Sequence, residues 1–378
     1  MRALALDRAA LEDVRAALRG AVADGLAKDG AQVRALPAYL PPAPAGLRGR
    51  ALAIDCGGTN LRAAVVELGE ADRLLAGPVT AKVPTGRDGA SVSRSVFFDA
   101  HAELAARLAG AEGLPVGYCF SYPSQSRPDH DATLIRWTKG VRVEGVEGTA
   151  VGAGLRAALA ARGLAPGAVA VLNDTVASLI AGSRGTPSPE RMIGLIVGTG
   201  TNMATFIDAG EIAKPHASWR GSMAINLESG NFHPPHLTAW DDALDARSEN
   251  PSAQRFEKAV SGHYLPRLFQ VIAPDGAPES GEDLVRFAAE QSERGTLARL
   301  LLDRSADLVA AALAAVADHH PGEEPIGVLA EGGLFWSASG YRGRVAETLR
   351  MLGRPLEIRR QADANLAGAA VAALSAPK

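Results

Sequence analysis

The sequence predicts an α/β protein in which two similar lobes surround a central cleft. A pattern of apolar strand, glycine and threonine turn, and second apolar strand occurs twice in the chain. Helix-like segments alternate with strand-like runs, as is typical of α/β folds, and no low-complexity linker divides the chain into independent domains. With 378 residues, 47% of them hydrophobic, the chain can bury a large core, and its length favours more than one lobe.

The elements are predicted from the spacing of apolar residues. A helix is expected over residues 9–28, where apolar residues recur every three or four positions before a proline-rich stretch. The first strand–turn–strand unit spans 51–68, with its turn at 55–60. The second spans 193–207, with its turn at 198–202. A buried strand at 168–172 and further helices follow the same rules, the helices including residues 150–162, 175–181 and 306–317.

Charge and cysteine content exclude several classes of protein. Lysine and arginine total 39 against 42 aspartate and glutamate, a formal charge of -3, so no overall basic field attracts nucleic acid or an anionic membrane. The two cysteines, Cys56 and Cys119, lie in apolar runs without a CxxC pair, which argues against a disulfide framework or a zinc site. A reducing compartment fits this usage.

The apolar runs favour a soluble protein. Asp7 and Arg8 interrupt the N-terminal apolar run, so no export signal is expected. Elsewhere the longest apolar stretches fall well short of the roughly 20 residues that span a bilayer. We predict a cytoplasmic protein with small-molecule partners, no nucleic acid and no membrane, and we leave its oligomeric state open.

The glycine turns suit phosphate binding. Glycine lets the backbone approach an anion closely, and successive N–H groups can point at it. In the first turn Asp55 could hold a hydrated magnesium ion, and the Thr59 hydroxyl could donate a hydrogen bond. One such turn is equally consistent with a plain tight hairpin, but its repetition in a matching context favours phosphate. Neither turn precedes Gly-Lys-Ser or Gly-Lys-Thr or opens a helix, which disfavours a Walker loop and a dinucleotide fold.

Asp174 follows the buried strand at 168–172 and precedes a helix-like run. Ligands bind at the carboxyl ends of strands in open α/β sheets, so a carboxylate here is a candidate for chemistry. Asn173, Asp174 and Thr175 are also good helix caps, and taken alone these residue types favour a structural role. The surrounding motifs must decide between the two interpretations.

Three further clusters mix polar and aromatic residues, at 120–123, 137–140 and 226–230. Each could be a plain surface loop, where such residues usually lie. A hexose, however, needs many convergent donors and acceptors, and carboxylates and amides supply them. The set therefore favours a sugar as ligand.

These motifs together resemble the hexokinase family, within the actin-like ATPase and sugar-kinase superfamily. The resemblance runs from about Leu36 nearly to the C-terminus. Two segments resemble the family's phosphate motifs, and five more resemble hexokinase segments in order; they are 55–62 and 194–202, then 120–123, 137–140, 173–176, 225–228 and 250–258. The resemblance implies two ribonuclease H-like lobes around a cleft, the large lobe from 1–49 and 174–363 and the small lobe from 50–173 and 364–378.

The resemblance also implies roles for single residues. Asp174 would be the base that activates the sugar hydroxyl, and Lys139 would join it in catalysis. The expected hexose contacts are Ser121, Thr138, Lys139, Asn173, Asp174, Asn202, Glu228 and Glu257. The expected nucleotide contacts are Asp55, Gly57, Gly58, Thr59, Asn60, Arg62, Thr199, Gly200, Gly332 and Gly333. Asp55 would also hold magnesium through water.

The resemblance weakens at the nucleotide end of the chain. The segment 327–334 carries Glu331 where an aspartate is usual and Gly333 where a serine is usual. The segment 363–370 lacks the extra glycines and the basic residue common there, and the chain is shorter than typical members, mostly between Glu257 and Glu331. The acceptor is thus better indicated than the donor.

The expected reaction is transfer of a phosphoryl group from ATP, with Mg²⁺, to the 6-hydroxyl of a hexose, with glucose as the expected substrate. Lys139 and Arg62 would offset negative charge near the transferred group. Two alternatives stay open: a kinase for mannose, fructose or glucosamine, and a catalytically weak hexose-binding sensor. The sugar-lining segments disfavour a filament or chaperone ATPase, and no DNA-binding helix pair precedes Leu36.

Overall fold

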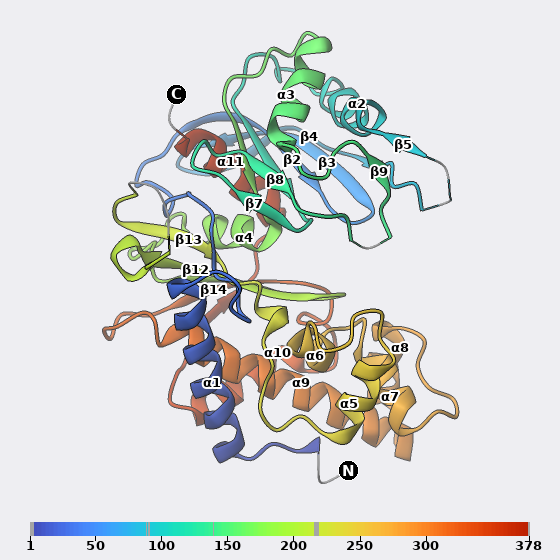
Figure 1. Ribbon diagram of the computed structural model, residues 1–378. Helices are drawn as coiled ribbons and strands as arrows, with labels where there is room; N and C mark the ends of the chain where they lie inside the picture. Colours follow the sequence, from blue (N-terminus) through green and yellow to red (C-terminus); the bar gives the residue numbers. More distant parts are fainter. Residues whose placement is uncertain (1–3, 88, 90, 139, 215–218, 377–378) are drawn as a thin grey trace.

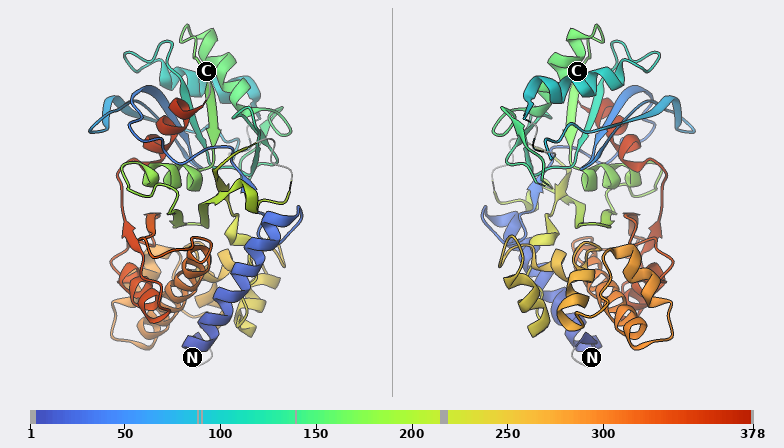
Figure 2. Two further views of the ribbon diagram at one scale, coloured as in Figure 1. Left: turned by 90° about the vertical axis from the view of Figure 1, so that its left-hand side faces the viewer. Right: turned by 90° about the vertical axis from the view of Figure 1, so that its right-hand side faces the viewer.

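The computed structural model describes residues 4–87, 89, 91–138, 140–214 and 219–376. In Figure 1 the chain forms an upper and a lower lobe, with the N-terminus at the bottom and the C-terminus at the top. Each lobe is built on one main sheet. The two views of Figure 2 show the same separation from both sides.

The upper sheet has five strands, and its order explains where the first glycine turn lies. The strands β2, β3 and β4 form an antiparallel meander, and β6 and β10 continue the sheet parallel to β2. The strands are β2 (Gly49–Cys56), β3 (Asn60–Leu68), β4 (Arg73–Lys82), β6 (Val116–Phe120) and β10 (Val169–Leu172). The first predicted turn therefore joins the first two strands of the meander.

The lower sheet repeats this arrangement. Here β11, β12 and β13 form the antiparallel meander, and β14 and β15 run parallel to β11; the short β1 pairs with β13 at the edge. The strands are β1 (Leu36–Pro37), β11 (Met192–Val197), β12 (Thr201–Asp208), β13 (Ser222–Asn226), β14 (Gly327–Glu331) and β15 (Glu357–Arg359). The two glycine turns thus occupy equivalent positions in two sheets of the same topology.

Smaller elements complete the upper lobe. Two short strand pairs flank its sheet, β5 (Val92–Ser93) with β9 (Val143–Glu144), and β7 (Ser124–Ser126) with β8 (Ala132–Leu134). Two helices pack together on the outer side, α2 (Arg94–Ala105) and α3 (Val151–Ala161). Phe97 of α2 and Leu155 of α3 belong to one hydrophobic core together with Ile54 of β2.

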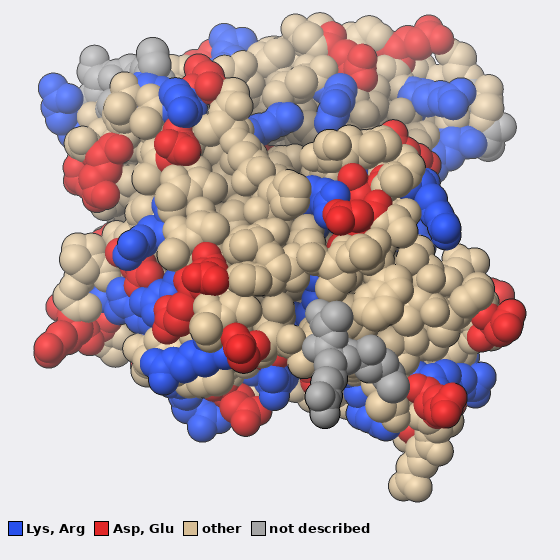
Figure 3. All heavy atoms as spheres, turned by 60° about the horizontal axis from the view of Figure 1, so that its bottom comes forward, with Lys and Arg blue, Asp and Glu red and all other residues tan. Residues whose placement is uncertain are grey.

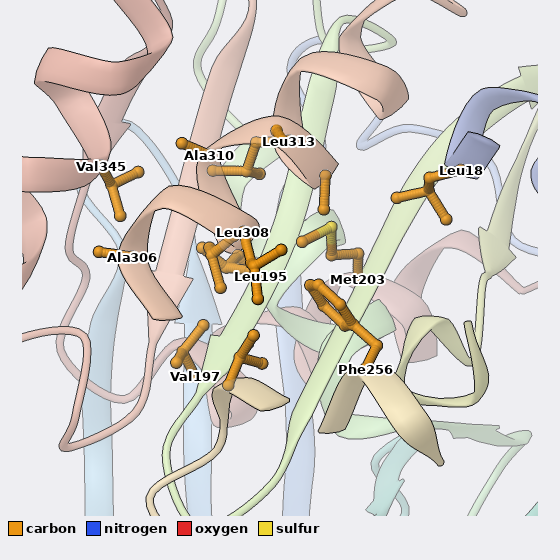
Figure 4. Packing of buried hydrophobic residues seen from close by; sticks show 14 of the residues in the cluster. Leu18, Leu195, Val197, Met203, Phe256, Ala306, Leu308, Ala310, Leu313 and Val345 are labelled. Carbon is orange, nitrogen blue, oxygen red and sulfur yellow. The ribbon is translucent and has the colours of Figure 1, made fainter. Parts of the chain in front are cut away.

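The lower lobe is covered by helices. Figure 4 shows α9 lying on the sheet, with Leu308 and Leu313 near Leu195 and Met203 of the second hairpin. The helices are α1 (Arg8–Ala27), α5 (Ala239–Ala246), α6 (Arg255–Val260), α7 (Leu265–Ile272), α8 (Gly281–Ala288), α9 (Glu293–Ala317) and α10 (Tyr341–Met351). The 3₁₀ turns η2 (Ala209–Glu211) and η3 (Ser229–Asn231) also lie in this lobe.

Two helices lie between the sheets and join the lobes. The helix α4 (Asp174–Ser183) packs on β11 and β14, whereas α11 (Ala364–Ser375) packs on β2 and β6 and against α4. Their contact is close: a Cβ built on Gly368 would lie 2.0 Å from the Ala177 carbonyl oxygen, and one on Gly117 would lie 1.8 Å from that of Ala369. Glycine is required at both points because no side chain fits between the backbones.

The predicted elements are present, with shifted bounds. The helix expected over 306–317 is the second half of α9, which begins at Glu293. Arg304 and Asp307 lie inside this helix as buried ion-pair members, bonded to Asp241 and Arg344. Asp303 and Arg304 lie just before the expected start and interrupt the apolar pattern, so the sequence indicated a shorter helix, whereas Asp307 lies within the expected range.

Among the described residues, none of the helices combines the length and the apolar character needed to cross a bilayer. Figure 3 shows one face of the molecule, on which acidic and basic side chains are intermixed. Cys56 and Cys119 are buried and form no disulfide with each other.

Candidate active site

The first glycine turn is a tight hairpin held by backbone hydrogen bonds. The Gly57 amide donates to the Asn60 carbonyl oxygen at 3.0 Å, which closes the turn. The Arg87 guanidinium donates to the Gly58 carbonyl oxygen at 2.8 Å, and Thr59 is exposed at the tip. The turn thus presents the Thr59 side chain to solvent at the end of the β2–β3 pair.

Asp55 lies at the base of this hairpin and is 7% exposed. Its Oδ2 lies 3.9 Å from Nη1 of Arg62, which is its neighbour on β3. Its Oδ1 is buried and has no hydrogen-bond partner among the described residues. Burial raises the pKa of Asp55, and the Asp174 carboxylate adds to this shift, whereas Cys119 and Arg62 oppose it. An orphaned carboxylate oxygen beside a second carboxylate is an environment that suits a cation.

Two further carboxylates, those of Asp363 and Glu331, interact with Asp55 or with its neighbour Arg62. Arg62 also forms an ion pair with Asp363, the residue that precedes α11. Burial raises the pKa of Glu331 at the end of β14; Asp55 and Asp363 act in the same direction, and Arg360 and Arg62 oppose them. The altered residue Glu331 is therefore electrostatically coupled to the base of the first hairpin.

Asp174 begins α4, but it is not the residue that caps the helix. The N-cap is Asn173, whose side chain accepts a hydrogen bond from the Thr175 amide at 2.9 Å. The Asp174 Oδ1 accepts from the same amide at 2.8 Å and from the Thr175 hydroxyl at 3.3 Å. Oδ1 of Asp174 thus shares the Thr175 amide with Asn173, and the Asp174 carboxylate also lies near enough to Asp55 to raise the pKa of Asp55.

The second glycine turn lies against the end of β14. The Gly198 amide donates to the Gly200 carbonyl oxygen at 2.9 Å, and Thr199 is exposed at the tip. A Cβ on Gly198 would lie 3.3 Å from the Cα of Gly332, so the two backbones touch. Gly332 directly follows Glu331, whereas Gly333 has open space around it. The second turn and the end of β14 therefore form one continuous surface.

A network of amides and carboxylates lines the next part of the site. The Asn202 amide donates to Oδ1 of Asn226 at 2.7 Å, and the Asn226 amide donates to Oε1 of Glu228 at 2.9 Å. Oδ1 of Asn202 accepts from the Ser229 amide at 3.1 Å. Glu228 has a φ of 54°, a left-handed conformation that is uncommon for a residue with a side chain. Such backbone strain is concentrated at functional sites.

Glu257 connects this network to the second glycine turn. Its Oε2 accepts a hydrogen bond from the Thr201 amide at 3.0 Å, and its Oε1 accepts from the Gln254 amide at 3.2 Å. A Cβ on Gly200 would lie 2.7 Å from Oε2 of Glu257. The expected hexose contact Glu257 and the expected nucleotide contact Gly200 thus adjoin directly.

The remaining expected residues come from the upper lobe. Ser121 follows β6, is buried, and donates its amide to the Cys56 carbonyl oxygen at 3.1 Å. Thr138 is half-buried, and its carbonyl oxygen accepts from the Val141 amide. Lys139 lies outside the described residues. Tyr122 donates its hydroxyl to the Gly57 carbonyl oxygen at 3.1 Å, so the segment that follows β6 adjoins the first glycine turn.

Comparison with known proteins identifies the family to which this chain belongs. Two family models described as hexokinase match the chain, one over residues 1–184 and the other over 192–292 and 294–375. The chain is 36% identical over 291 residues to Hexokinase-1 of Oryza sativa subsp. japonica, an alignment that covers 71% of this chain. The chain belongs to the hexokinase family.

This hexokinase-family chain is shorter than its curated relatives. It spans 57% of the rice protein, and 54% of Hexokinase-1 of Saccharomyces cerevisiae, to which it is 34% identical over 268 residues, or 66% of this chain. Among solved structures, a hexokinase from Schistosoma mansoni complexed with glucose matches with a TM-score of 0.84 and 25% identity, covering 99% of this chain and 97% of that one.

More distant structures support the fold. A ROK family glucokinase from Streptomyces griseus, solved with glucose and AMPPNP, matches with a TM-score of 0.53 and 21% identity over 85% of this chain and 98% of that one. These matches, with the two sheets of equal topology, confirm the prediction of a two-lobed α/β fold of the actin-like ATPase type. The predicted resemblance to hexokinases is likewise confirmed.

Several residues of the site were missed in the sequence prediction. Asn226 joins two expected hexose contacts, Gln254 bonds Glu257, and Asp363 pairs with Arg62. Asn226 and Gln254 stand inside segments that already resembled the family, so their amide groups were the available signal. The pairing of Arg62 with Asp363 joins residues 301 positions apart, and no local pattern indicates it.

Proposed function

We propose that this chain is an ATP-dependent hexokinase that phosphorylates the 6-hydroxyl of a hexose, with glucose as its preferred acceptor and Asp174 as general base. Membership of the hexokinase family and the likeness to a glucose-complexed relative support this proposal. The observation that carries it is the position of Asp174. Its carboxylate lies near enough to Asp55, at the base of the first hairpin, to raise the pKa of Asp55, and Asn173 is the N-cap residue of its helix.

The mechanism follows from the positions of these groups. Asn202, Glu228 and Glu257 bind and orient the hexose. Asp174 accepts the proton of the 6-hydroxyl as that oxygen forms a bond to the γ-phosphorus, and the bond from the γ-phosphorus to the bridging oxygen breaks to release ADP. Arg62 and Lys139 offset the negative charge of the transferred group. General base catalysis of this kind contributes roughly 10² to 10⁴ in rate.

The nucleotide is assigned to the two glycine turns and the end of β14. The backbone amides of Gly58 and Gly200 and the hydroxyls of Thr59 and Thr199 are the proposed phosphate donors, with Gly57 and Asn60 beside them in the first turn. Gly332 packs against the second turn, and Gly333 beside it leaves room for the nucleoside. The lack of contacts around Gly333 supports this placement, because a flat group can approach its backbone closely.

The residues present fit a hydrated divalent cation. Oδ1 of Asp55 is buried without a partner, and Asp174, Glu331 and Asp363 act on the same neighbourhood. Among the described residues no group of three or more His, Cys, Asp or Glu side chains is placed to hold a metal ion directly. The proposed holder is Asp55, through water. When bound, Mg²⁺ would neutralise charge on the nucleotide phosphates.

The lobes are proposed to move as two units, residues 1–49 with 174–363 and residues 50–173 with 364–378. The packing of α11 on β2 and β6 supports placing the C-terminal helix with the small lobe. Closure on the sugar would assemble the site late and so limit hydrolysis of ATP by water. The reaction is assigned to the cytoplasm, where ATP and reduced thiols are found.

A turnover assay with a hexose panel tests the function. ADP release would be measured with Mg-ATP and glucose, mannose, fructose or glucosamine, together with calorimetry of hexose binding. We expect hexose-dependent ADP release, highest kcat/KM for glucose, and little release without sugar. Hexose binding without ADP release under any nucleoside triphosphate would contradict the proposal and support the sensor alternative.

A further inference from the structure

The short helix α6 carries Glu257, which bonds to the second glycine turn, and two buried cations, which pair with α5. Arg255 and Lys258 flank Glu257 on this helix, and their side chains are only 8% and 3% exposed. Burying a cation is costly unless an anion and hydrogen bonds compensate it. Asp245 of α5, itself 8% exposed, pairs with both cations, and Asp242 of the same helix also pairs with Arg255.

Asp245 holds α6 and the loop before it at three points. It accepts hydrogen bonds from Nζ of Lys258 at 2.6 Å and from the Ser252 amide at 2.8 Å, and its Oδ2 lies 3.1 Å from Nη1 of Arg255. Nζ of Lys258 also donates to the Asn250 carbonyl oxygen at 2.8 Å. Burial alone would raise the pKa of Asp245, but the bonds from Lys258 and Ser252 outweigh it and hold the pKa below its ordinary value.

The same loop leads directly to Glu257. The Asn250 side chain donates to Gln254, and Gln254 donates to Oε1 of Glu257. Gln254 has a φ of 53°, a left-handed conformation that persists only when the surrounding contacts enforce it. Oε2 of Glu257 then accepts from the Thr201 amide in the second glycine turn. A continuous chain of contacts therefore runs from Asp245 through Glu257 to the turn.

We infer that Asp245 is a positioning residue of the phosphoryl-transfer site: it fixes the carboxylate of Glu257 and, through Glu257, the amide of Thr201. The inference rests on the proposed function for its kinetic consequences. Its structural consequence, the hydrogen bond between Glu257 and Thr201, does not. One residue thereby aligns a hexose-binding carboxylate with a phosphate-binding turn, although it contacts neither ligand itself.

A second buried aspartate on the same helix provides a matched control. Asp241 lies one turn before Asp245 on α5, is 5% exposed, and forms a bidentate ion pair with Arg304 of α9 at 2.9 and 3.0 Å. It also completes the capping box with Thr238. Asp241 thus has the burial and pairing of Asp245, but it bonds to Arg304 of α9 and to Thr238, whereas Asp245 bonds to α6 and the loop before it.

The experiment compares Asp245→Asn with Asp241→Asn. Glucose affinity is measured by calorimetry, KM and kcat by ADP release, and the Thr201 amide by hydrogen exchange of the 198–207 peptide. For Asp245→Asn we expect the glucose affinity to fall and the KM for glucose to rise, each by about tenfold. Misplacing a positioned group by about 1 Å can lower the reaction rate by up to about 100-fold. We also expect faster exchange at 198–207. Asp241→Asn should lower the melting temperature but keep glucose affinity and exchange at 198–207 within about twofold of the natural protein.

Lys258→Met breaks the same contact from the α6 side and replaces Asp245→Asn if that variant does not fold. Lys258→Arg, which keeps the charge, should recover most of the glucose affinity. Unchanged exchange at 198–207 and unchanged glucose affinity in Asp245→Asn or Lys258→Met would overturn the inference. A natural protein that binds glucose without turnover would contradict the proposed function alone, because the exchange and binding measurements still decide the role of Asp245.

Discussion

Replacing Gly332 with alanine should lower the free energy of unfolding and raise the KM for ATP far more than the same change at Gly333. Gly332 has a φ of 108°, a conformation that residues with a side chain rarely adopt. A Cβ there would lie 2.2 Å from the carbonyl oxygen of Val197, the last residue of β11. That oxygen already accepts the Phe335 amide at 3.0 Å, so it is held in place. Gly333, by contrast, has no atom within 4 Å of a built Cβ.

The magnitude follows from two costs. A strained φ costs of order 1–3 kcal/mol, and forcing extra volume into a packed site costs typically about 1–3 kcal/mol more. Gly332→Ala should therefore lower the free energy of unfolding by about 2–6 kcal/mol. Gly333→Ala should change it by less than about 1 kcal/mol, since removing a glycine from the unfolded chain gains roughly 0.4–1 kcal/mol.

Urea unfolding of the natural protein and both variants measures these differences. In the folded fraction of Gly332→Ala, the KM for ATP should rise more than the KM for glucose, because Gly332 touches the second glycine turn at Gly198. Equal unfolding midpoints and equal ATP KM values for the two variants would refute this reasoning.

Three further outcomes are expected. Burial lowers the pKa of both His101 and His320 to about 4, so both side chains stabilise the fold fully above their unfolded pKa of about 6.5 and lose that contribution as pH falls toward 4. Urea unfolding at pH 5.5 should thus give a free energy about 2–3 kcal/mol below that at pH 7.5, and an unchanged value would contradict it. Arg62→Met should lower kcat about 100-fold while changing stability by no more than about 1 kcal/mol, because the pair with Asp363 is part-exposed; a kcat within threefold of the natural value would exclude the role. Small-angle scattering should show a smaller radius of gyration with glucose, and an unchanged radius would count against lobe closure.

The repeated strand–turn–strand pattern allowed the two lobes to be predicted from the sequence. Each pattern begins with a buried, nearly continuous apolar strand, β2 or β11, at the start of an antiparallel meander, and such local signals are strong. The helix at 9–28 was predicted to within one residue at each end, because Asp7 caps it and its buried face repeats every three or four positions. Local chemistry was sufficient for these elements.

The ionic contacts of the lower lobe could not be predicted in the same way. Asp245, Arg255 and Lys258 are charged, and charged residues in a sequence normally indicate a solvated surface. Only the structure shows that the three side chains are buried together between α5 and α6. The same holds for Arg62 and Asp363, which come from opposite ends of the chain. Long-range pairing of charges leaves no periodic signal.

The most direct test of the proposed function is the turnover of Asp174→Asn. This change keeps the size of the side chain and removes its ability to accept the hydroxyl proton. Glucose-dependent ADP release should fall by roughly 10² to 10⁴ in kcat, while glucose affinity by calorimetry stays within about tenfold of the natural protein. A kcat within threefold of the natural value, with glucose still bound, would contradict the assignment of Asp174 as the base.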